Sequence, residues 1–331
     1  MNVIAGDVGG TNTRLVYAEI TKSNTRTVAK QVYKSEEYSG LEQIIDHFLA
    51  EQKIEVKIDA ICLGIAGPVK AGEVAVTNLP WHVSENSLKK KYSTNQVALL
   101  NDFAAIAYAI PYFDSEDVFT LQQGVEEGLK NVAIVGAGTG LGSCHVITEN
   151  NVIKPLASEA GHCSFSAENN LQCELLQWMW QKNKFVSVES LVSGRGIFSI
   201  YQFLKYKEVA VENVLIAEKM NQYDPARVIS EHANEDKLCQ RTIELFVEIY
   251  AAAIRNVILH YYPLSGIYIA GGIALKIRRF MESAKFIETF TKNDAMQDNL
   301  KSITINLILD ENPGLKGVLS YCRLNYDVTG V

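Results

Sequence analysis

The sequence predicts a protein of two α/β domains with a cleft between them. The chain has 331 residues, 47% of them hydrophobic, and this length exceeds the size at which one hydrophobic core usually stops growing. Strand-like and helix-like apolar patterns alternate along it, which is typical of an α/β layer architecture. No low-complexity linker separates the halves. We therefore expect domains joined by packed crossovers, with a boundary near residue 110.

The predicted elements follow in the order that this architecture requires. Strands are expected where apolar residues alternate or run together, at residues 3–8, 13–20, 60–66, 97–100, 131–135 and 266–270. Helix-like patterns occupy residues 41–49, 103–110, 238–260 and 315–324. Glycine and proline mark several boundaries, at Gly67-Pro68, Gly271-Gly272 and Pro313-Gly314.

Charge and targeting signals argue against several classes of protein. The formal net charge is −7, and lysine and arginine are scattered or in short groups such as Lys89, Lys90 and Lys91, so no nucleic-acid surface is expected. The N-terminal segment has no basic region and contains Asp7, which argues against a signal or transit peptide. The sequence has no apolar run of about 18 residues. We expect a cytoplasmic protein with no membrane partner.

The cysteines favour neither a disulfide framework nor a zinc ribbon. They lie far apart along the chain, and none forms the CxxC pair that is typical of a zinc ribbon. We expect reduced, mostly buried thiols that pack as small hydrophobic groups. The six residues are Cys62, Cys144, Cys163, Cys173, Cys239 and Cys322.

Two stretches resemble each other within the chain. Residues 3–20 and 133–150 superpose at an offset of 130, and each reads as a strand, a glycine-rich turn and a strand. The offset pairs Gly6 with Gly136 and Gly10 with Gly140, but it pairs Asp7 with Ala137. A duplicated hairpin with one acidic member would suit two half-sites that close on one polyphosphate.

The first turn has the composition of an anion site. Glycine lets backbone N–H groups approach a ligand closely, and hydroxyl and amide side chains add donors. Asp7, at the strand end, would hold Mg²⁺ through water, because Mg²⁺ favours one or two carboxylates plus phosphate oxygens. The residues concerned are Gly6, Asp7, Gly9, Gly10, Thr11, Asn12 and Thr13.

Two common nucleotide motifs do not describe these turns. Neither turn has the Gly-Lys-Ser/Thr of a Walker A loop. The segment GAGTGLG has glycine at every second position and precedes strand-like residues, whereas a Rossmann fingerprint opens a helix. The alternative interpretation is that each turn is an ordinary β-hairpin bend.

Asp102 is the candidate catalytic base. It follows the predicted strand 97–100 and precedes the helical residues 103–110, at the strand edge where ligands sit in open α/β sheets. A carboxylate there would accept the proton of an attacking hydroxyl, and it needs no raised pKa because positioning dominates phosphoryl transfer. The alternative is that Asn101 and Asp102 only cap the helix.

Glu159, His162 and Glu189 form a looser polar group. Adjacent sugar hydroxyls match the two oxygens of a carboxylate, so these residue types suit hexose recognition through charge-assisted hydrogen bonds. Glu159 and His162 also have a spacing possible for metal ligands, but structural zinc wants four nitrogen or sulfur ligands. As isolated residues, the two glutamates would be solvated surface charges.

Seven ordered segments carry a resemblance to a known family. They are GDVGGTNTR (6–14), TNLPW (77–81), NDF (101–103), GAGTGLG (136–142), EAGH (159–162), IAGGI (269–273) and NPGLKG (312–317). Together they resemble the bacterial glucokinases of the hexokinase and actin-like ATPase superfamily, over nearly the whole chain. The resemblance implies the actin-like ATPase (ribonuclease H-like) fold, with 1–110 plus 312–331 as a small α/β domain, 111–311 as a large one, and a deep cleft between them.

The resemblance also implies the chemistry. D-glucose would be phosphorylated at its 6-hydroxyl by ATP and Mg²⁺, as the first step of glycolysis, with Asp102 as base and hinged domain closure on the sugar. The glucose ligands implied are Asn78, Asn101, Glu159, His162 and Glu189. The implied nucleotide and metal ligands are Asp7, Gly9, Thr11 and Asn12, then Gly138 and Thr139 for the β- and γ-phosphates, and Gly271 and Gly272 beside the adenosine. A homodimer is expected from the family alone.

Departures and rival functions follow from the same residues. Ala160 stands where many relatives carry glycine, and Cys163 and Cys173 do not supply the cluster of zinc-binding sugar kinases, so no structural zinc is expected. The rivals are a kinase of fructose, mannose or an N-acetyl sugar, a sugar-sensing transcriptional regulator, an actin-like filament protein and an inactive pseudokinase. The regulator would need a helix-turn-helix before Asp7, and the filament protein would lack the sugar ligands.

Overall fold

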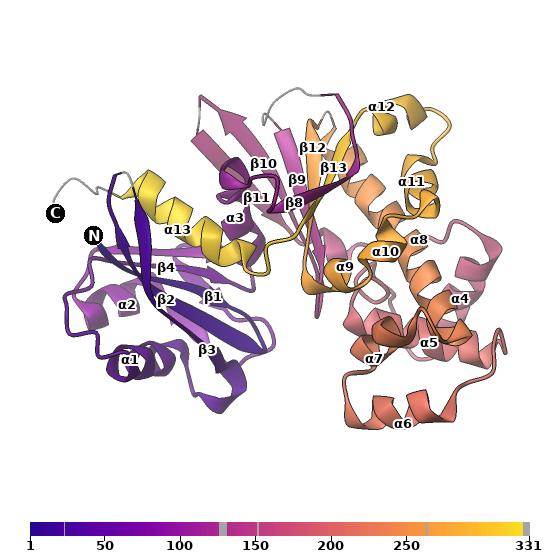
Figure 1. Ribbon diagram of the computed structural model, residues 1–331, viewed down its shortest axis with the longest axis horizontal. Coiled ribbons are helices and arrows are strands. Elements are labelled where there is room, and N and C mark those ends of the chain that lie inside the picture. The colour runs from indigo at the N-terminus through magenta and orange to yellow at the C-terminus, as the bar shows by residue number, and fades with distance from the viewer. Residues whose placement is uncertain (23, 126–130, 151, 263, 327–331) are drawn as a thin grey trace. The chain divides into compact units, whose positions relative to one another are not determined.

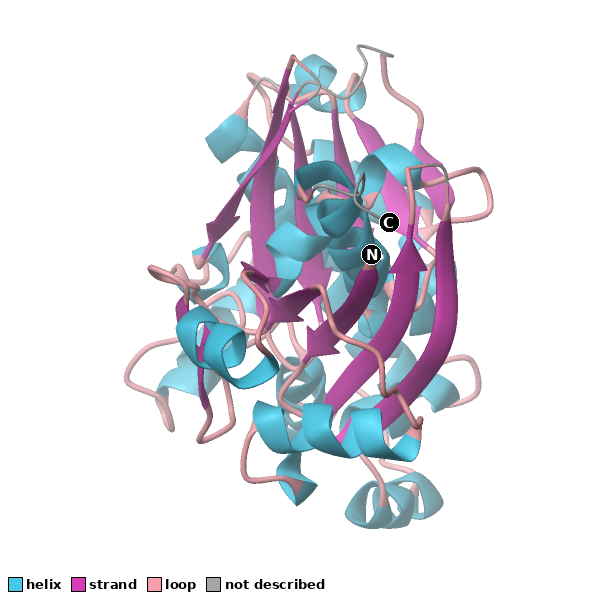
Figure 2. Cartoon of the chain, turned by 90° about the vertical axis from the view of Figure 1, so that its left-hand side faces the viewer, coloured by secondary structure: helices cyan, strands magenta, loops and turns pink. Residues whose placement is uncertain are grey.

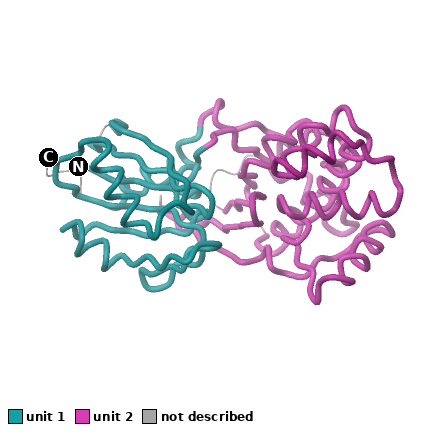
Figure 3. Tube along the Cα trace, turned by 90° about the horizontal axis from the view of Figure 1, so that it is seen from below, with its two compact units in different colours: residues 1–113, 312–331 teal, residues 114–311 magenta. Residues whose placement is uncertain are grey.

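The chain forms two compact units. The computed structural model describes residues 1–22, 24–125, 131–150, 152–262 and 264–326 (Figure 1). Unit 1 comprises Met1–Phe113 and Asn312–Val331, and unit 2 comprises Asp114–Glu311, drawn in teal and magenta in Figure 3. Of the predicted small-domain segment 312–331, residues 327–331 lie outside the described residues.

Unit 1 is built on a five-stranded sheet with the strand order β3-β2-β1-β4-β7. Strand β1 pairs antiparallel with β2 and parallel with β4, and β4 pairs parallel with β7. The strands are β1 (Asn2–Val8), β2 (Asn12–Ile20), β3 (Thr25–Lys34), β4 (Ala60–Ile65) and β7 (Gln96–Asn101), with a separate hairpin of β5 (Glu73–Ala75) and β6 (His82–Ser84). The helices are α1 (Leu41–Glu51), α2 (Glu85–Tyr92), α3 (Asp102–Ala107) and α13 (Pro313–Asn325), with 3-10 turns at Ser35–Glu37 and Ile110–Tyr112.

Both faces of this sheet are buried. On one face Ile4 and Leu63 pack with Ile44 and Phe48 of α1. The other face belongs to a cluster that includes Val318 and Cys322 of α13. Strand β4 is therefore buried along its whole length, which explains why it reads as a continuous apolar run.

Unit 2 contains a six-stranded sheet with the order β11-β10-β9-β12-β13-β8. Figure 2 draws the strands of the chain in magenta and its helices in cyan. Its centre is parallel, β9 with β12 and β12 with β13, and its edges are antiparallel. The strands are β8 (Val118–Gln122), β9 (Asn131–Ala137), β10 (Leu141–Glu149), β11 (Val152–Ser158), β12 (Gly266–Ala270) and β13 (Thr304–Ile308). The helices are α4 (Asn170–Trp180), α5 (Gly194–Tyr206), α6 (Val214–Gln222), α7 (Pro225–His232), α8 (Lys237–Tyr261), α9 (Gly272–Lys276), α10 (Arg278–Met281), α11 (Ala284–Thr291) and α12 (Gln297–Lys301), with a 3-10 turn at Ala160–His162.

The predicted elements are all present, with shifted ends. The helix expected over 103–110 ends at Ala107 and is followed by the 3-10 turn at Ile110–Tyr112, where Pro111 lies. The last helix begins at Pro313 instead of residue 315, because proline fits the first position of a helix. Edge strand β3 was not predicted, since most of its residues are at least partly exposed.

Three further features bear on the sequence predictions. None of the described helices is long and apolar enough to cross a membrane. Within the same described residues, no cluster of three or more histidine, cysteine or acidic side chains could bind a metal. All six cysteines are free, and four are buried, but Cys163 and Cys173 are exposed.

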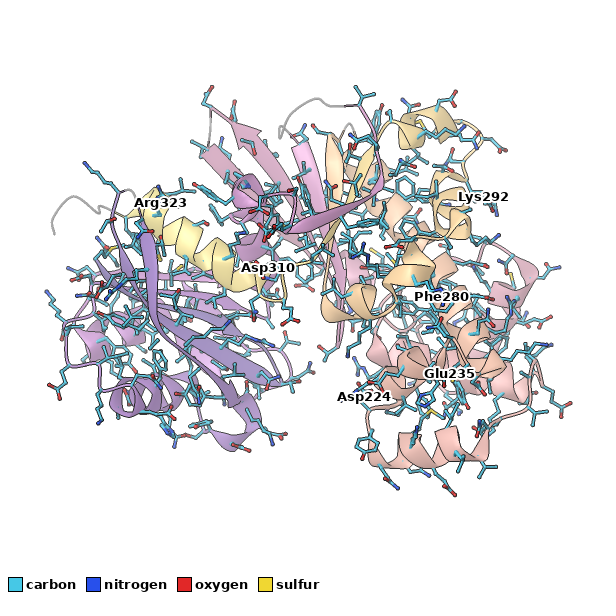
Figure 4. The ribbon with its side chains drawn as sticks, in the orientation of Figure 1. Asp224, Glu235, Phe280, Lys292, Asp310 and Arg323 are labelled. Atoms are coloured by element: carbon cyan, nitrogen blue, oxygen red, sulfur yellow. The ribbon has the colours of Figure 1, made fainter. Side chains whose placement is uncertain are left out.

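Arg255 is a buried cation that joins three parts of unit 2. It lies on α8 with 5% of its surface exposed. Its guanidinium donates to the carbonyls of Thr289 (3.0 Å) and Lys292 (3.1 Å) at the end of α11, and it forms an ion pair with Glu168. Lys292 is labelled in Figure 4. The guanidinium thus satisfies the carbonyl oxygens that a helix end leaves without partners.

Replacing Arg255 should therefore destabilise unit 2 strongly. We expect Arg255→Met to lower the free energy of unfolding by about 3–5 kcal/mol, because Glu168 loses its buried partner. Arg278→Met is the matched control, since Arg278 forms an i,i+4 pair with Glu282 and is more exposed, and it should cost less than about 1 kcal/mol. Urea denaturation measures both, and equal losses would contradict the assignment.

His145 should make stability depend on pH. Its ring stacks on Tyr261 (centroids 4.6 Å apart), its Nε2 is buried without a described partner, and burial lowers its pKa. The unfolded chain then binds the proton more readily, so stability is complete above the ordinary histidine pKa and falls as pH drops through it towards the folded value. His145→Phe keeps an aromatic ring and removes the titration. Wild type should lose up to about 1.4 kcal/mol per pH unit relative to this variant in that window, and parallel pH profiles would refute the prediction.

Candidate functional site

The turn between β1 and β2 is held by hydrogen bonds from inside unit 1. The N–H of Gly9 donates to the carbonyl of Asn12 (3.0 Å), and the N–H of Ser35 donates to that of Thr11 (3.0 Å). The hydroxyl of Ser35 donates to the carbonyl of Gly9 (2.8 Å). The carbonyls of Gly9, Thr11 and Asn12 are therefore engaged with the protein.

Asp7 lies one residue before the end of β1, opposite Arg14 on β2. Burial raises the pKa of this carboxyl, and the Arg14 guanidinium, 3.5 Å away, opposes the rise. The start of α13 lies beside this carboxylate, since a Cβ added at Gly314 would be in van der Waals contact with an Asp7 oxygen (3.6 Å). One partly exposed carboxylate with room for water fits Mg²⁺, which retains much of its hydration.

A series of contacts connects this turn to Asp102. Gly10 lies beside Asn78, where an added Cβ would be 3.4 Å from the Asn78 Cβ, and Asn78 has a φ of 64°. The N–H of Thr77, which precedes Asn78, donates to the carbonyl of Ala66 (3.0 Å). The amide of Asn101 donates to the carbonyl of the adjacent Gly67 (3.2 Å). These contacts place the turn between β1 and β2 along one edge of unit 1, together with Asn78 and the Asn101-Asp102 pair.

Asn101, and not Asp102, is the cap of α3. Its Oδ1 accepts from the N–H groups of Phe103 (3.1 Å) and Ala104 (3.2 Å). Its Nδ2 donates to Asp102 Oδ1 (2.9 Å), which also accepts from Phe103 N–H (3.0 Å). The carboxylate of Asp102 is therefore oriented by its neighbours at the first position of the helix. Asn101 uses its amide inside the protein, so its predicted contact with sugar stays a prediction.

The second glycine turn, between β9 and β10, is built differently from the first. Here Ala137 pairs with Leu141 across three residues, whereas Val8 pairs with Thr13 across four. Gly138 donates its N–H to Gly140 (2.8 Å) and accepts from Gly194 at the start of α5 (2.9 Å). No described atom lies within 4 Å of a Cβ placed on Gly138, so this turn leaves space for a ligand beside the backbone.

The other glycine pair lies against the same strand. Ala270 of β12 pairs with Gly136 of β9, and Gly271 follows with a φ of 95°. A Cβ on Gly271 would overlap the carbonyl of Ala137, so only glycine fits there. At Gly272 a Cβ would meet nothing described within 4 Å, which leaves the start of α9 open.

Glu189 connects the polar group of unit 2 to this second turn. Its Oε2 accepts from the N–H of Leu141 (3.0 Å), and its own N–H donates to the carbonyl of Gly161 (2.9 Å). Glu159 and His162 lie on either side of Gly161 in the sequence, and both are exposed. The distance between His162 Nε2 and Glu159 Oε2 is 3.9 Å. The structure therefore brings Glu159, His162 and Glu189 together beside residues 138–141.

Sequence reasoning missed several residues of these sites. Ser35 is one, and Tyr250, whose buried hydroxyl accepts from Ala137 N–H (3.2 Å), is another. Arg195 is a third, and its guanidinium lies 3.6 Å from Glu189 Oε1. Ser35 and Tyr250 belong to no glycine-rich segment or acidic motif, so the sequence carried no signal for them. Arg195 stands between Gly194 and Gly196, and this glycine pair was the signal that could have drawn attention to it.

Comparisons with known proteins agree on one family. The sequence model described as Glucokinase matches residues 4–325. A glucokinase from Trichormus variabilis is 34% identical and covers 95% of this chain and 97% of its own. The solved glucokinase of an Antarctic psychrotroph is 28% identical, with a TM-score of 0.79 and coverage of 98% and 99%. A ROK family glucokinase from Streptomyces griseus, in complex with glucose and AMPPNP, is 18% identical, with a TM-score of 0.64 and coverage of 96% and 98%.

Gly161 should not tolerate a side chain, although the adjacent residue is already an alanine, Ala160. A Cβ at Gly161 would overlap the carbonyl of Leu141, so Gly161→Ala should lower the free energy of unfolding by about 1–3 kcal/mol. Gly138→Ala is the control, because the space beside Gly138 is open, and its stability should stay within about 0.5 kcal/mol of wild type. Thermal melting compares the two, and an unchanged Gly161→Ala melting temperature would contradict the packing described.

Proposed function

The chain belongs to the glucokinase family, and we propose that it transfers the γ-phosphate of ATP to the 6-hydroxyl of D-glucose with Asp102 as the general base. As a member of this family, the protein is an ATP:D-glucose 6-phosphotransferase (EC 2.7.1.2) of glycolysis. It has the actin-like ATPase fold. The predictions of family, fold class and enzyme class are thereby confirmed.

One observation carries the assignment of the base. The Asp102 carboxylate is oriented at the end of β7 by Asn101 and Phe103, in the same unit as the Gly9–Asn12 turn. A base held in advance loses little freedom when substrate binds, and positioning supplies most of the rate enhancement in phosphoryl transfer.

The reaction balances as a direct transfer. The 6-oxygen of glucose forms a bond to the γ-phosphorus while the bond from that phosphorus to the β,γ-bridging oxygen breaks, and ADP leaves. Asp102 accepts the proton of the hydroxyl late in this step. The products are glucose 6-phosphate, ADP and a proton that Asp102 later returns to water.

The glycine turns bind the phosphates in this proposal. Gly9, Gly10, Thr11 and Asn12 present donors to one part of the triphosphate, and Gly138 and Thr139 present donors to the β- and γ-phosphates. Bound Mg²⁺, with Asp7 as a ligand through water, would neutralise charge on the phosphate oxygens. Gly271 and Gly272 would lie beside the adenosine, where the open start of α9 leaves room.

The proposed glucose ligands are amide, carboxylate and imidazole side chains. Asn78 supplies an amide group near Asp102, and Asn101 would exchange one of its bonds inside the protein for a bond to the sugar. Glu159, His162 and Glu189 supply charged or polar groups beside the second turn. Carboxylates suit adjacent hydroxyls because each of their oxygens accepts a charge-assisted bond. The glucose and AMPPNP bound to the Streptomyces griseus glucokinase support glucose and ATP as substrates. A homodimer and a cytoplasmic location are further parts of the proposal.

Asp102→Asn tests the base directly. We expect kcat for glucose 6-phosphate formation with ATP and Mg²⁺ to fall by about 10²- to 10⁴-fold, because asparagine accepts the same N–H but not the proton. The variant should keep its melting temperature and its KM for ATP. Asp224→Asn is the matched control, since Asp224, labelled in Figure 4, also lies at a helix start, as the cap of α7, and it should retain full activity. If Asp102→Asn kept more than about a tenth of wild-type activity, the assignment would fail.

A further inference from the structure

Ser35 is a fully buried residue that contacts the first glycine turn through its hydroxyl and its N–H, while its carbonyl accepts from the N–H of Tyr38 (3.2 Å). It comes immediately after the edge strand β3, and its exposed fraction is 0%. Its hydroxyl donates to the Gly9 carbonyl (2.8 Å), and its N–H donates to the Thr11 carbonyl (3.0 Å). The Thr13 hydroxyl lies 3.0 Å from the Ser35 hydroxyl.

The directions of these bonds follow from counting protons. A serine hydroxyl has one hydrogen and two acceptor positions. Since the Ser35 hydrogen is directed to Gly9, the Thr13 hydroxyl must donate to Ser35. Thr13 is equally buried, with 0% exposed. The pair therefore forms a relay in which Thr13 orients the Ser35 hydroxyl, and that hydroxyl holds the carbonyl of Gly9.

Holding that carbonyl also decides where the next N–H points. The carbonyl of Gly9 and the N–H of Gly10 belong to one planar peptide group and point in opposite directions. With glycine on both sides, no Cβ opposes rotation of this group. Among the residues that the structure describes, neither Gly10 N–H nor Thr11 N–H has an acceptor. These donors are thus left available to a ligand.

We propose that Ser35 is a positioning residue for nucleotide binding, which keeps the Gly9–Gly10 peptide turned so that the Gly10 N–H faces the triphosphate. The inference rests on the proposed function of the turn as a phosphate site. Without the hydroxyl, the Gly9 carbonyl loses its buried donor, and the peptide is free to rotate. A rotated peptide presents a carbonyl oxygen to the phosphates, which repels them.

Ser35→Ala and Thr13→Val separate this role from general stability. Thr13 was expected in the anion site, but it is fully buried and its hydroxyl bonds Ser35, so it is not open to a ligand. Both substitutions therefore remove one buried hydroxyl of the same hairpin, but Thr13→Val leaves the Ser35 donor to Gly9 in place. Calorimetric titration with Mg²⁺ and ADP, without sugar, should show about tenfold weaker binding for Ser35→Ala. This is the size of effect expected when the buried Gly9 carbonyl loses its donor, the Ser35 hydroxyl. Thr13→Val should stay within about threefold of wild type. Ser35→Thr, which restores a hydroxyl, should recover most of the affinity.

Kinetics supply the second readout. Ser35→Ala should raise the KM for ATP about tenfold and leave the KM for glucose within about twofold. If Ser35→Ala melts too low for assay, Ser35→Cys, with its weaker donor, replaces it with the same expected direction. Unchanged ADP affinity in the Ser35 variant, or equal weakening in Thr13→Val, would overturn the inference. A wild-type protein that binds ADP but does not phosphorylate glucose would overturn the proposed function instead.

Discussion

The pairing of one row of residues across the sheet of unit 1 brings the first glycine turn and Asp102 to the same edge of the sheet. Val8 pairs with Thr13 on one side and with Ile65 on the other, and Ile65 pairs with Asn101. The residues that follow this row along the chain are the glycine turn after β1, Gly67 after β4 and Asp102 after β7. A shift of one residue in any of these pairings would reverse the faces of a strand and would separate the turn from the carboxylate.

Close approach of backbones is the second requirement of this arrangement. A Cβ at Gly317 of α13 would overlap the carbonyl of Ala105 in α3, and at Gly64 it would lie 3.0 Å from the Ala105 Cβ. Helix α3, which begins with Asp102, is thus seated between β4 and α13 by residues without side chains. In unit 2, Gly161 and Gly271 allow similar contacts with Leu141 and Ala137. Interiors packed this closely leave the site little freedom to relax.

The two units differ in where they place charge. Unit 1 contributes Asp7, whose pKa is raised by burial despite Arg14, and Asp102. Unit 2 contributes Glu189, which is bonded to the backbone of Leu141, and the exposed Glu159 and His162. A carboxylate kept in a partly desolvated position gains more from a cation than one in open water, which suits the role that we propose for Asp7 beside Mg²⁺ and phosphates.

The sequence by itself determined the family, the α/β class, the strands that carry the glycine turns, and Asp102 as a candidate base. These follow from local patterns: apolar periodicity, glycine where turns are tight, and acidic residues at strand ends. Only the tertiary structure decided that Asn101 caps α3, that Glu189 bonds the second turn, and that Ser35 holds the first. Ser35 meets Gly9 because β3 pairs with β2 in one register, and no local pattern encodes a hydrogen bond between residues 26 positions apart. Such contacts depend on which strands become neighbours, and that is settled when the whole sheet packs.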